Sequence, residues 1–515
     1  MKKLLFSSIL TIFAFSFFSC DKLSDSEKKS LVPIEIWYSP YSSADAPLPS
    51  DWFGFKKIEN DLGIKLKAVP LPSKREEQAE VLLKAARSNS LPDFFMVNRE
   101  LLVQLVKENK VARLDSIFQL MPTRTRLMYT GEARKNGMFD GLTYGLSQVG
   151  SIDKNEGVLI RKDWLDKLGL GIPVTTEDFF NVMNAFTFND PDGNGKDDTF
   201  GWGAFIEINN HEEGLGRRFS PFFGAFGVAG TFNATREKTG LNIKKPEFYD
   251  ALDFVRKMVS AKVIDPNWTA YKKDDFREAW KNGRFGMMRE QNAAFALETN
   301  YRPFDEKFPD GEWILIDPPT GPKGKKSVGC YTQAYRTFAV SRRTAELGKL
   351  PVLANLLEWM MTDGYNIICY GEENVNFRED NGEITTEGLF DPALAYTQKA
   401  AAPLLQLRNL VFYGSDEELK SRYPTWKSQN GKEMSALKIL REMQKCEWTP
   451  SVGVPSPSQE VKMLYEQGVL DFVTGKRNLT RTNWTDWLSE FNRRGGEEWN
   501  KQCLDYVEAN NSYID

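Results

Sequence analysis

The most specific chemical pattern in the sequence is an oxygen-rich stretch over 190–198, Asp-Pro-Asp-Gly-Asn-Gly-Lys-Asp-Asp. Its donors stand at positions 1, 3, 5, 7 (through a backbone carbonyl) and 9: Asp190, Asp192, Asn194, Lys196 and Asp198. This spacing is typical of the first part of an EF-hand loop, where alternate oxygens converge on calcium and a glycine at position 6 permits a sharp turn. Gly201 stands at position 12, so water or a distant donor must replace the usual glutamate. We expect a structural calcium ion in the loop 190–201; a solvated turn is the alternative.

A second chemical signal surrounds Cys20. Lys2 and Lys3 precede a largely apolar run that ends in Ser-Phe-Phe-Ser-Cys, which is the layout of a secretory leader. The cysteine at the cleavage site resembles a bacterial lipobox, which implies cleavage before Cys20 and its acylation, for example with palmitate. The polar residues that follow predict a flexible tether. We expect a lipid-anchored protein at the extracytoplasmic face of the cell membrane, in the periplasm or at the cell surface. An ordinary leader with a chance cysteine is the alternative.

Common catalytic signatures are missing from the sequence. His211 is the only histidine, and Asn-Asn-His-Glu-Glu around it lacks the spacing of a zinc protease helix. Neither a Gly-x-Ser-x-Gly elbow nor a phosphate-binding glycine-rich loop occurs. Carboxylates are plentiful, and two suffice for glycoside hydrolysis, so a secreted carbohydrate-active enzyme (a glycosidase or lyase) stays open as an alternative. We expect a protein that is not an enzyme.

The other cysteines, the net charge and the length narrow the class of protein further. Four cysteines are too widely spaced for a zinc site but leave one or two disulfides open in an exported protein: Cys330, Cys369, Cys446 and Cys503. The net charge of −4 becomes −6 when the leader with its two lysines is removed, so nothing favours nucleic-acid binding. With 515 residues and 41% hydrophobic content, the chain has material for two or three domains. No other apolar run approaches the roughly 20 residues of a membrane span.

The elements that must position these residues alternate between strand and helix. Apolar patterning predicts strands over 32–37, 63–69, 92–97, 156–160 and 284–288, and helices over 76–87 and 99–109. A capping box at Thr175–Asp178 opens a further helix, and the chain from Pro403 onward is mostly helical. This alternation predicts parallel sheets covered by helices.

Several stretches carry a family resemblance. The most specific is Leu159-Ile-Arg-Lys-Asp-Trp-Leu-Asp-Lys-Leu-Gly169 with Pro173-Val-Thr-Thr-Glu-Asp178; others are Leu91-Pro-Asp-Phe-Phe95, Asp140-Gly-Leu-Thr-Tyr-Gly145 and Phe472-Val-Thr-Gly475. Together with the lipobox and the calcium loop, they make the chain resemble family 1 extracellular solute-binding proteins of ATP-binding cassette (ABC) importers. It is most similar to the oligosaccharide-binding lipoprotein subgroup, which includes alginate-oligosaccharide binders. Those binders carry an acidic ligand just after the ninth loop position, where this chain has Thr199.

The resemblance implies an α/β, two-lobed periplasmic-binding-protein fold (type II, large cluster) with hinge crossings and a mostly helical C-terminal part. The lobes would close over a carbohydrate, in particular an oligosaccharide, and the loaded form would deliver it to the transmembrane subunits of an ABC permease. We expect a monomer. A surface sensory or adhesive sugar-binding lipoprotein with the same fold is a further alternative.

The resemblance also divides the chain. We expect a signal peptide over 1–19, the lipidated cysteine and tether over 20–33, and the first part of the N-lobe over 34–150. The C-lobe then begins over 151–325, the chain returns to the N-lobe over 326–375, and 376–515 completes the C-lobe with the C-terminal helices.

Solute-contacting residues are expected in the loops that follow strands, because in open α/β sheets these loops face the cleft. The candidates are Trp37, Tyr38, Tyr41, Asn98, Arg99, Ser147, Gln148, Trp202, Arg289, Glu290, Tyr331 and Tyr335. Some of the aromatic rings would stack on sugar rings while polar neighbours bind hydroxyl groups, although each ring taken singly more often packs in a core. Arg99 and Arg289 suit a carboxylated sugar through bidentate bonds, or else form ion pairs within a lobe.

Overall fold

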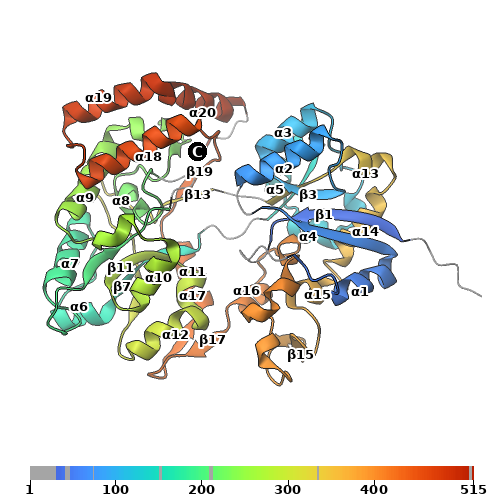
Figure 1. The fold of residues 1–515 in the computed structure, drawn as a ribbon, viewed down its shortest axis with the longest axis horizontal. Helices are drawn as coiled ribbons and strands as arrows, with labels where there is room; N and C mark the ends of the chain where they lie inside the picture. The colour runs from blue at the N-terminus through green and yellow to red at the C-terminus, as the bar shows by residue number, and fades with distance from the viewer. Residues whose placement is uncertain are drawn as a thin grey trace, which may run out of the picture.

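The computed structural model describes residues 31–40, 47–72, 75–149, 154–207, 213–332, 336–509 and 513–514. The signal peptide, Cys20, Tyr41, His211 and Tyr335 lie outside these ranges. The described chain forms two α/β lobes that lie side by side (Figure 1). Within the described ranges no helix is both long and apolar enough to cross a membrane.

The N-lobe is built on a five-stranded sheet of order β2-β1-β3-β14-β6. Strands β1 (Val32–Tyr38), β2 (Ile64–Pro70) and β3 (Phe94–Val97) are parallel, whereas β14 (Arg336–Val340) runs antiparallel to β3 and to β6 (Gly145–Gln148). The sheet is buried on both faces. Helices α1 (Phe53–Leu62) and α14 (Leu350–Trp359) share an apolar cluster with Phe94, and α2 (Arg75–Arg87) and α3 (Arg99–Lys107) share another with Phe95. Burial on both faces explains why β3 is apolar at successive positions.

The C-lobe is built on a four-stranded sheet of order β12-β7-β11-β8. Strand β7 (Glu156–Arg161) pairs antiparallel with β11 (Phe285–Gln291) and β12 (Trp313–Ile316), and β8 (Phe200–Gly203) runs parallel to β11. Alternate residues of β7 enter different cores: Val158 and Ile160 pack on one face, and Leu159 packs on the other.

The helices of the C-lobe divide between these two cores. The first core includes residues of α7 (Thr176–Phe188), α9 (Pro246–Ser260), α18 (Gln459–Thr474), α19 (Arg481–Phe491) and α20 (Glu497–Ala509). The second includes residues of α10 (Lys273–Lys281), α12 (Glu298–Lys307) and α17 (Ala436–Lys445). The predicted capping box at the start of α7 is confirmed, since the Thr175 and Asp178 side chains each accept the other's backbone N–H.

The chain passes from one lobe to the other between described elements at three places. The first leads from β6 to β7, and the second from β13 (Cys330–Thr332) to β14. The third runs from Tyr413 through α16 (Asp416–Arg422) to β17 (Thr425–Lys427). The predicted two-lobed α/β fold with a mostly helical C-terminal part is confirmed, and no disulfide joins the four cysteines of the described ranges.

Two of the predicted lobe boundaries differ from the structure. The expected return to the N-lobe at 326 falls later, because β13 still pairs with the C-lobe strand β19 (Thr449–Ser451). The expected departure at 376 also falls later, because Phe377, Tyr396 and Leu405 lie in the N-lobe core. The hairpin of β15 (Arg378–Asp380) and β16 (Glu383–Thr385) and the short turns after it are thus an N-lobe extension.

Candidate functional site

The N-lobe edge at the connections carries a neutral hydrogen-bond network. The end of β6 pairs with the start of β14, which places Ser147 opposite Thr337 with their hydroxyl oxygens 2.8 Å apart. Asn136, from α5 (Gly131–Asn136), donates from Nδ2 to the Thr337 hydroxyl at 2.8 Å. All three side chains satisfy one another without a formal charge.

Gln148 holds the same edge to the chain that leads into the third connection. Its Nε2 donates to the Asn409 carbonyl at 2.9 Å, and its Oε1 accepts from the Arg124 guanidinium at 3.2 Å. The Asn409 side chain in turn donates to the Pro40 carbonyl at 3.0 Å. Gln148 and Ser147 were both predicted to contact solute, but both are fully buried and lie beneath the surface of this edge.

The predicted residues near β1 have structural partners. Tyr38 is fully buried, and burial raises the pKa of its hydroxyl to about 12. The Leu48 backbone opposes this shift in part. Trp37 is half-buried and donates from Nε1 to Glu35 at 2.8 Å.

Two other predicted residues begin α3. Asn98 caps the helix by accepting the Leu101 N–H at 2.7 Å. Arg99 donates to the Asn136 carbonyl and lies 4.9 Å from the centre of the Phe139 ring. It also bonds to the hydroxyl of Tyr506, whose pKa is raised by burial and lowered in part by this arginine. Because Tyr506 belongs to α20, Arg99 connects the N-lobe to the C-lobe.

The facing C-lobe edge is stabilised by buried ion pairs. Glu156, at the start of β7, lies 2.9 Å from Arg289 and 2.9 Å from Arg217. Glu290, beside Arg289 on β11, lies 3.2 Å from Arg218 and 3.3 Å from Arg277. Burial by itself would raise the pKa of Glu156, but the nearby guanidinium groups lower it to about 2. Arg289 and Glu290 therefore form ion pairs within the lobe, which was the alternative expected for Arg289.

Trp202 lies inside the C-lobe core. Its indole is fully buried and packs edge-on against Phe222, with ring centres 4.7 Å apart. Packing inside the C-lobe core therefore accounts for this residue.

Half-buried aromatic rings lie where the connections meet the C-lobe. Lys154, in the first connection, places Nζ 4.3 Å from the centre of the Tyr331 ring on β13. Trp448 precedes the neighbouring strand β19, and the Arg289 guanidinium lies 5.6 Å from the centre of its ring. Trp448 is not among the contact residues predicted from the sequence. The only signal for it is a tryptophan beside Thr-Pro-Ser in an otherwise helical region.

The loop 190–198 folds around its own carboxylates. Asp190 has a positive φ of 45° and accepts backbone N–H bonds from Gly193, at 2.9 Å, and Gly195, at 3.0 Å. The Asn194 amide donates to Asp192 at 2.8 Å and to Asp198 at 3.1 Å. Burial and the charges of Asp190 and Asp198 raise the pKa of Asp192, although the Asn194 N–H opposes them.

This donor set fits a hard cation. Three carboxylates converge at one turn, and a 180° rotation of the Asn194 amide would replace its N–H₂ by an oxygen. In the described ranges, however, no three His, Cys, Asp or Glu side chains are already arranged as metal ligands.

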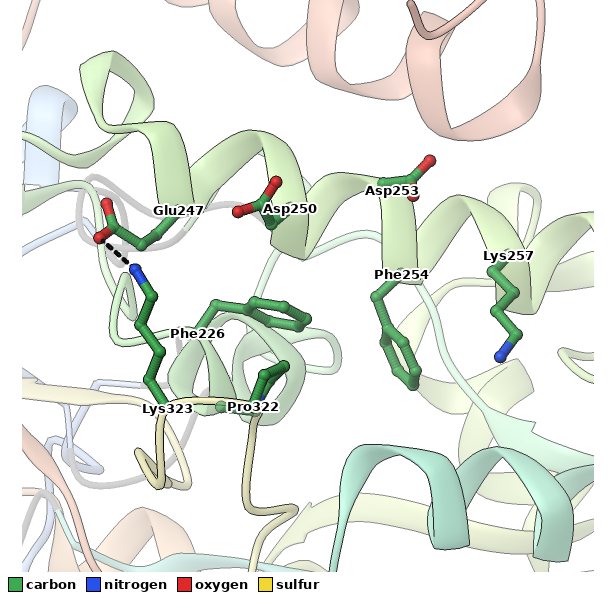
Figure 2. A pocket seen from close by; sticks show the side chains of 9 residues that line it. Phe226, Glu247, Asp250, Asp253, Phe254, Lys257, Pro322 and Lys323 are labelled. Atoms are coloured by element: carbon green, nitrogen blue, oxygen red, sulfur yellow. Dashed lines mark hydrogen bonds and ion pairs between the residues drawn. The ribbon is translucent and has the colours of Figure 1, made fainter.

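A pocket of about 350 Å³ lies within the C-lobe, between α9, the end of α8 (Ser220–Ala225) and the loop around Pro322 (Figure 2). The Phe226 and Phe254 rings line it with centres 6.2 Å apart. Lys323 at one end is bonded to Glu247 at 3.1 Å, as Figure 2 shows. No N-lobe residue lines this pocket, so it is distinct from the site expected between the lobes.

Comparison with curated proteins gives two similar relatives from Bacillus subtilis. The chain is 26% identical over 263 residues to the polygalacturonan/rhamnogalacturonan-binding protein YtcQ, covering 49% of each chain. It is 28% identical over 291 residues to the lipoprotein LipO, covering 56% of this chain and 57% of LipO. The chain thus spans about half the length of these relatives. No family model matches the sequence.

Solved structures with the same fold cover nearly the whole chain. An EF-hand mutant of the S. pneumoniae ABC-transporter substrate-binding protein FusA, in complex with fructo-nystose, gives a TM-score of 0.62 at 16% identity, covering 94% of this chain and 99% of FusA. The alginate-binding protein AlgQ2 without calcium ion gives a TM-score of 0.62 at 16% identity, covering 93% and 98%. The predicted resemblance is confirmed: the chain is similar to family 1 extracellular solute-binding proteins and has their two-lobed fold.

Proposed function

We propose that this protein is the solute-binding lipoprotein of an ABC importer, which captures an oligosaccharide between its lobes and delivers it to the permease. The observation that carries the proposal is the pair of independently packed lobes, joined by three connections with Tyr331 and Trp448 beside them. Aromatic rings of this kind stack on the C–H faces of sugars. YtcQ is named as a polygalacturonan/rhamnogalacturonan-binding protein, and the FusA structure is a complex with fructo-nystose, which supports a carbohydrate as the solute.

Calorimetry with neutral and uronic oligosaccharides tests this function. We expect calorimetry to detect binding of at least one sugar. Chromatography of the same mixtures should show no cleavage products, and the protein should be a monomer in solution. Trp448→Ala should weaken that binding about fivefold or more, since truncating an aromatic anchor in a binding site costs about 1 kcal/mol or more. Tyr249→Ala, which removes a half-buried ring on α9, is the matched control and should leave affinity unchanged. Turnover of a sugar would support the secreted enzyme instead, and binding without any effect of permease deletion on uptake would support a sensory or adhesive protein.

The same proposal includes a calcium ion in the loop 190–198, held by Asp190, Asp192, Asn194 and Asp198 with the Lys196 carbonyl. When bound, calcium would neutralise the converging carboxylates and stiffen the loop after α7. A chelator should lower the melting temperature, and added calcium should restore it. The variant Asp190→Ala/Asp192→Ala should lack this response; an equal response in variant and native protein would contradict the site.

We further propose a lipid anchor at Cys20, in keeping with the name of LipO. The native protein should fractionate with membranes and carry acyl chains on its N-terminal peptide by mass spectrometry. Cys20→Ser should release it into the soluble extracytoplasmic fraction. Soluble native protein without acyl chains would contradict the anchor.

A further inference from the structure

Beside the third connection between the lobes, helix α16 contacts helix α17 through a few side chains. Phe412, Leu419 and Leu440 form a small apolar cluster that is separate from the cores of both lobes. Phe412 ends the N-lobe segment, Leu419 belongs to α16, and Leu440 belongs to α17. In Figure 1, α16 lies on the side of the N-lobe that faces the C-lobe, and α17 and β17 belong to the C-lobe. The exposed side chains of Asp416 and Arg441 add an ion pair between the same two helices.

Helix α16 is fixed to the N-lobe. Its buried Glu418 accepts a bond from the Tyr365 hydroxyl of α15 (Tyr365–Tyr370) and another from the Gly414 N–H at 2.7 Å. At the other end of the helix, the Ser421 carbonyl accepts from the Tyr396 hydroxyl at 2.8 Å. These bonds tie both ends of α16 to N-lobe residues, so the helix must move with the N-lobe.

Helix α17 is fixed to the C-lobe through its other face. Ala436 and Met443 lie in the C-lobe cluster that also contains Trp426, and Ile439 packs against it. The Trp426 indole donates to the Ala296 carbonyl at 3.1 Å. The same helix therefore presents Met443 to its own lobe and Leu440 to α16.

We propose that the Phe412–Leu419–Leu440 cluster is a pivot that sets the angle between the lobes. Close-packed apolar contacts resist separation and sliding, whereas a rotation about the contact keeps the three side chains buried. The other two connections offer no comparable helix pair in the described ranges. Removing Leu440 leaves a cavity at this contact, so the lobes should sample a wider range of angles while each lobe stays folded.

Interlobe distances in the solute-free protein test the pivot. Spin labels on one exposed helix of each lobe would report distance distributions by pulsed electron spin resonance, after Cys330→Ser and Cys446→Ser remove the half-buried thiols. Leu440→Ala should at least double the width of the distribution. Ile439→Ala is the matched control, because it truncates the neighbouring residue on the C-lobe face of α17 and should leave the width unchanged. If Leu440→Ala does not fold, Leu440→Val gives the same test with a smaller broadening.

A native width in a folded Leu440 variant, or equal broadening by Ile439→Ala, would overturn the pivot. A second readout rests on the proposed function. For whichever oligosaccharide of the panel binds native protein, Leu440→Ala should weaken affinity about 3- to 10-fold without touching the sugar, because fewer molecules are poised to close. The distance measurement uses no solute, so failure of the pivot and failure of the sugar-binding function are distinguishable.

Discussion

The two lobes stabilise their facing edges with different chemistry. The N-lobe edge uses mostly neutral groups: Ser147, Thr337 and Asn136 bond to one another, and Gln148 binds a backbone carbonyl and the Arg124 guanidinium. The C-lobe edge uses buried charges, with Glu156 and Glu290 each between arginines. The C-lobe edge thus depends on pairing between buried opposite charges, whereas the N-lobe edge depends on hydrogen bonds of hydroxyl and amide side chains. Loss of one charge should therefore damage the C-lobe far more than loss of one amide damages the N-lobe.

The largest effect is expected for Glu156→Gln. Removing the carboxylate leaves Arg289 buried beside Arg217 and Arg218 without its counter-charge, and broken buried pairs cost about 3–5 kcal/mol. Denaturant unfolding should show this loss of stability. Glu278→Gln is the control, because it removes an exposed partner of Lys281 and should change stability by less than about 0.5 kcal/mol. Equal stability of the two variants would break the comparison between the lobes.

Acid should act through the same carboxylate. The folded pKa of Glu156 is about 2, below the value of an unfolded glutamate, so its contribution is fully present above pH of about 4.3 and is lost as pH falls toward about 2. Stability measured across this window should fall more steeply in native protein than in Glu156→Gln. If the stability of the two proteins falls equally steeply with falling pH, another titrating group causes the loss of stability.

A smaller effect is expected for Gln148→Ala in the N-lobe. The Arg124 guanidinium and the Asn409 carbonyl would each lose one buried partner, which costs about 1–3 kcal/mol. Gln104→Ala, on the exposed face of α3, controls for the loss of an amide. A smaller loss of unfolding free energy in Gln148→Ala than in Glu156→Gln would sharpen the contrast between the lobes. A larger loss in Gln148→Ala would reverse it.

The smallest effect is expected where the lobes touch through Arg99 and Tyr506. Tyr506→Phe removes one hydroxyl and leaves Arg99 its bond to the Asn136 carbonyl, so the loss should be about 0.5–1.5 kcal/mol. A double-mutant cycle with Arg99→Ala would isolate the coupling between the two side chains. Tyr513→Phe, which removes a hydroxyl bonded to Glu508, should show no coupling to Arg99.

Local signals in the sequence predicted local structure well. The capping box at Thr175–Asp178, the strand over 92–97 and the helix that starts at Arg99 depend on residues within a few positions of one another, and all three are present. Lobe boundaries were predicted less well. Phe377 and Tyr396 pack against Tyr370, with ring centres 5.8 and 5.1 Å apart. All three belong to a core that also contains residues of β1, far earlier in the chain, so no local pattern shows which lobe they join.

Site residues show the same division. The sequence selects Arg289 because it follows a strand, but its partner Glu156 lies on another strand 133 positions earlier. Trp448 is not among the predicted residues, because its place near Arg289 is created only when the chain folds and β19 pairs with β13. The calcium-type spacing, by contrast, is local, and the loop does gather Asp192 and Asp198 around Asn194.

The sequence by itself determined the order of strands and helices, the export signal pattern and the acidic loop, because each depends on neighbours along the chain. Only the tertiary structure decided which polar residues neutralise one another, where the third connection leaves the N-lobe, and that α16 and α17 meet between the lobes. Those outcomes depend on contacts between segments far apart in sequence, whose free energy is realised only when both lobes have packed.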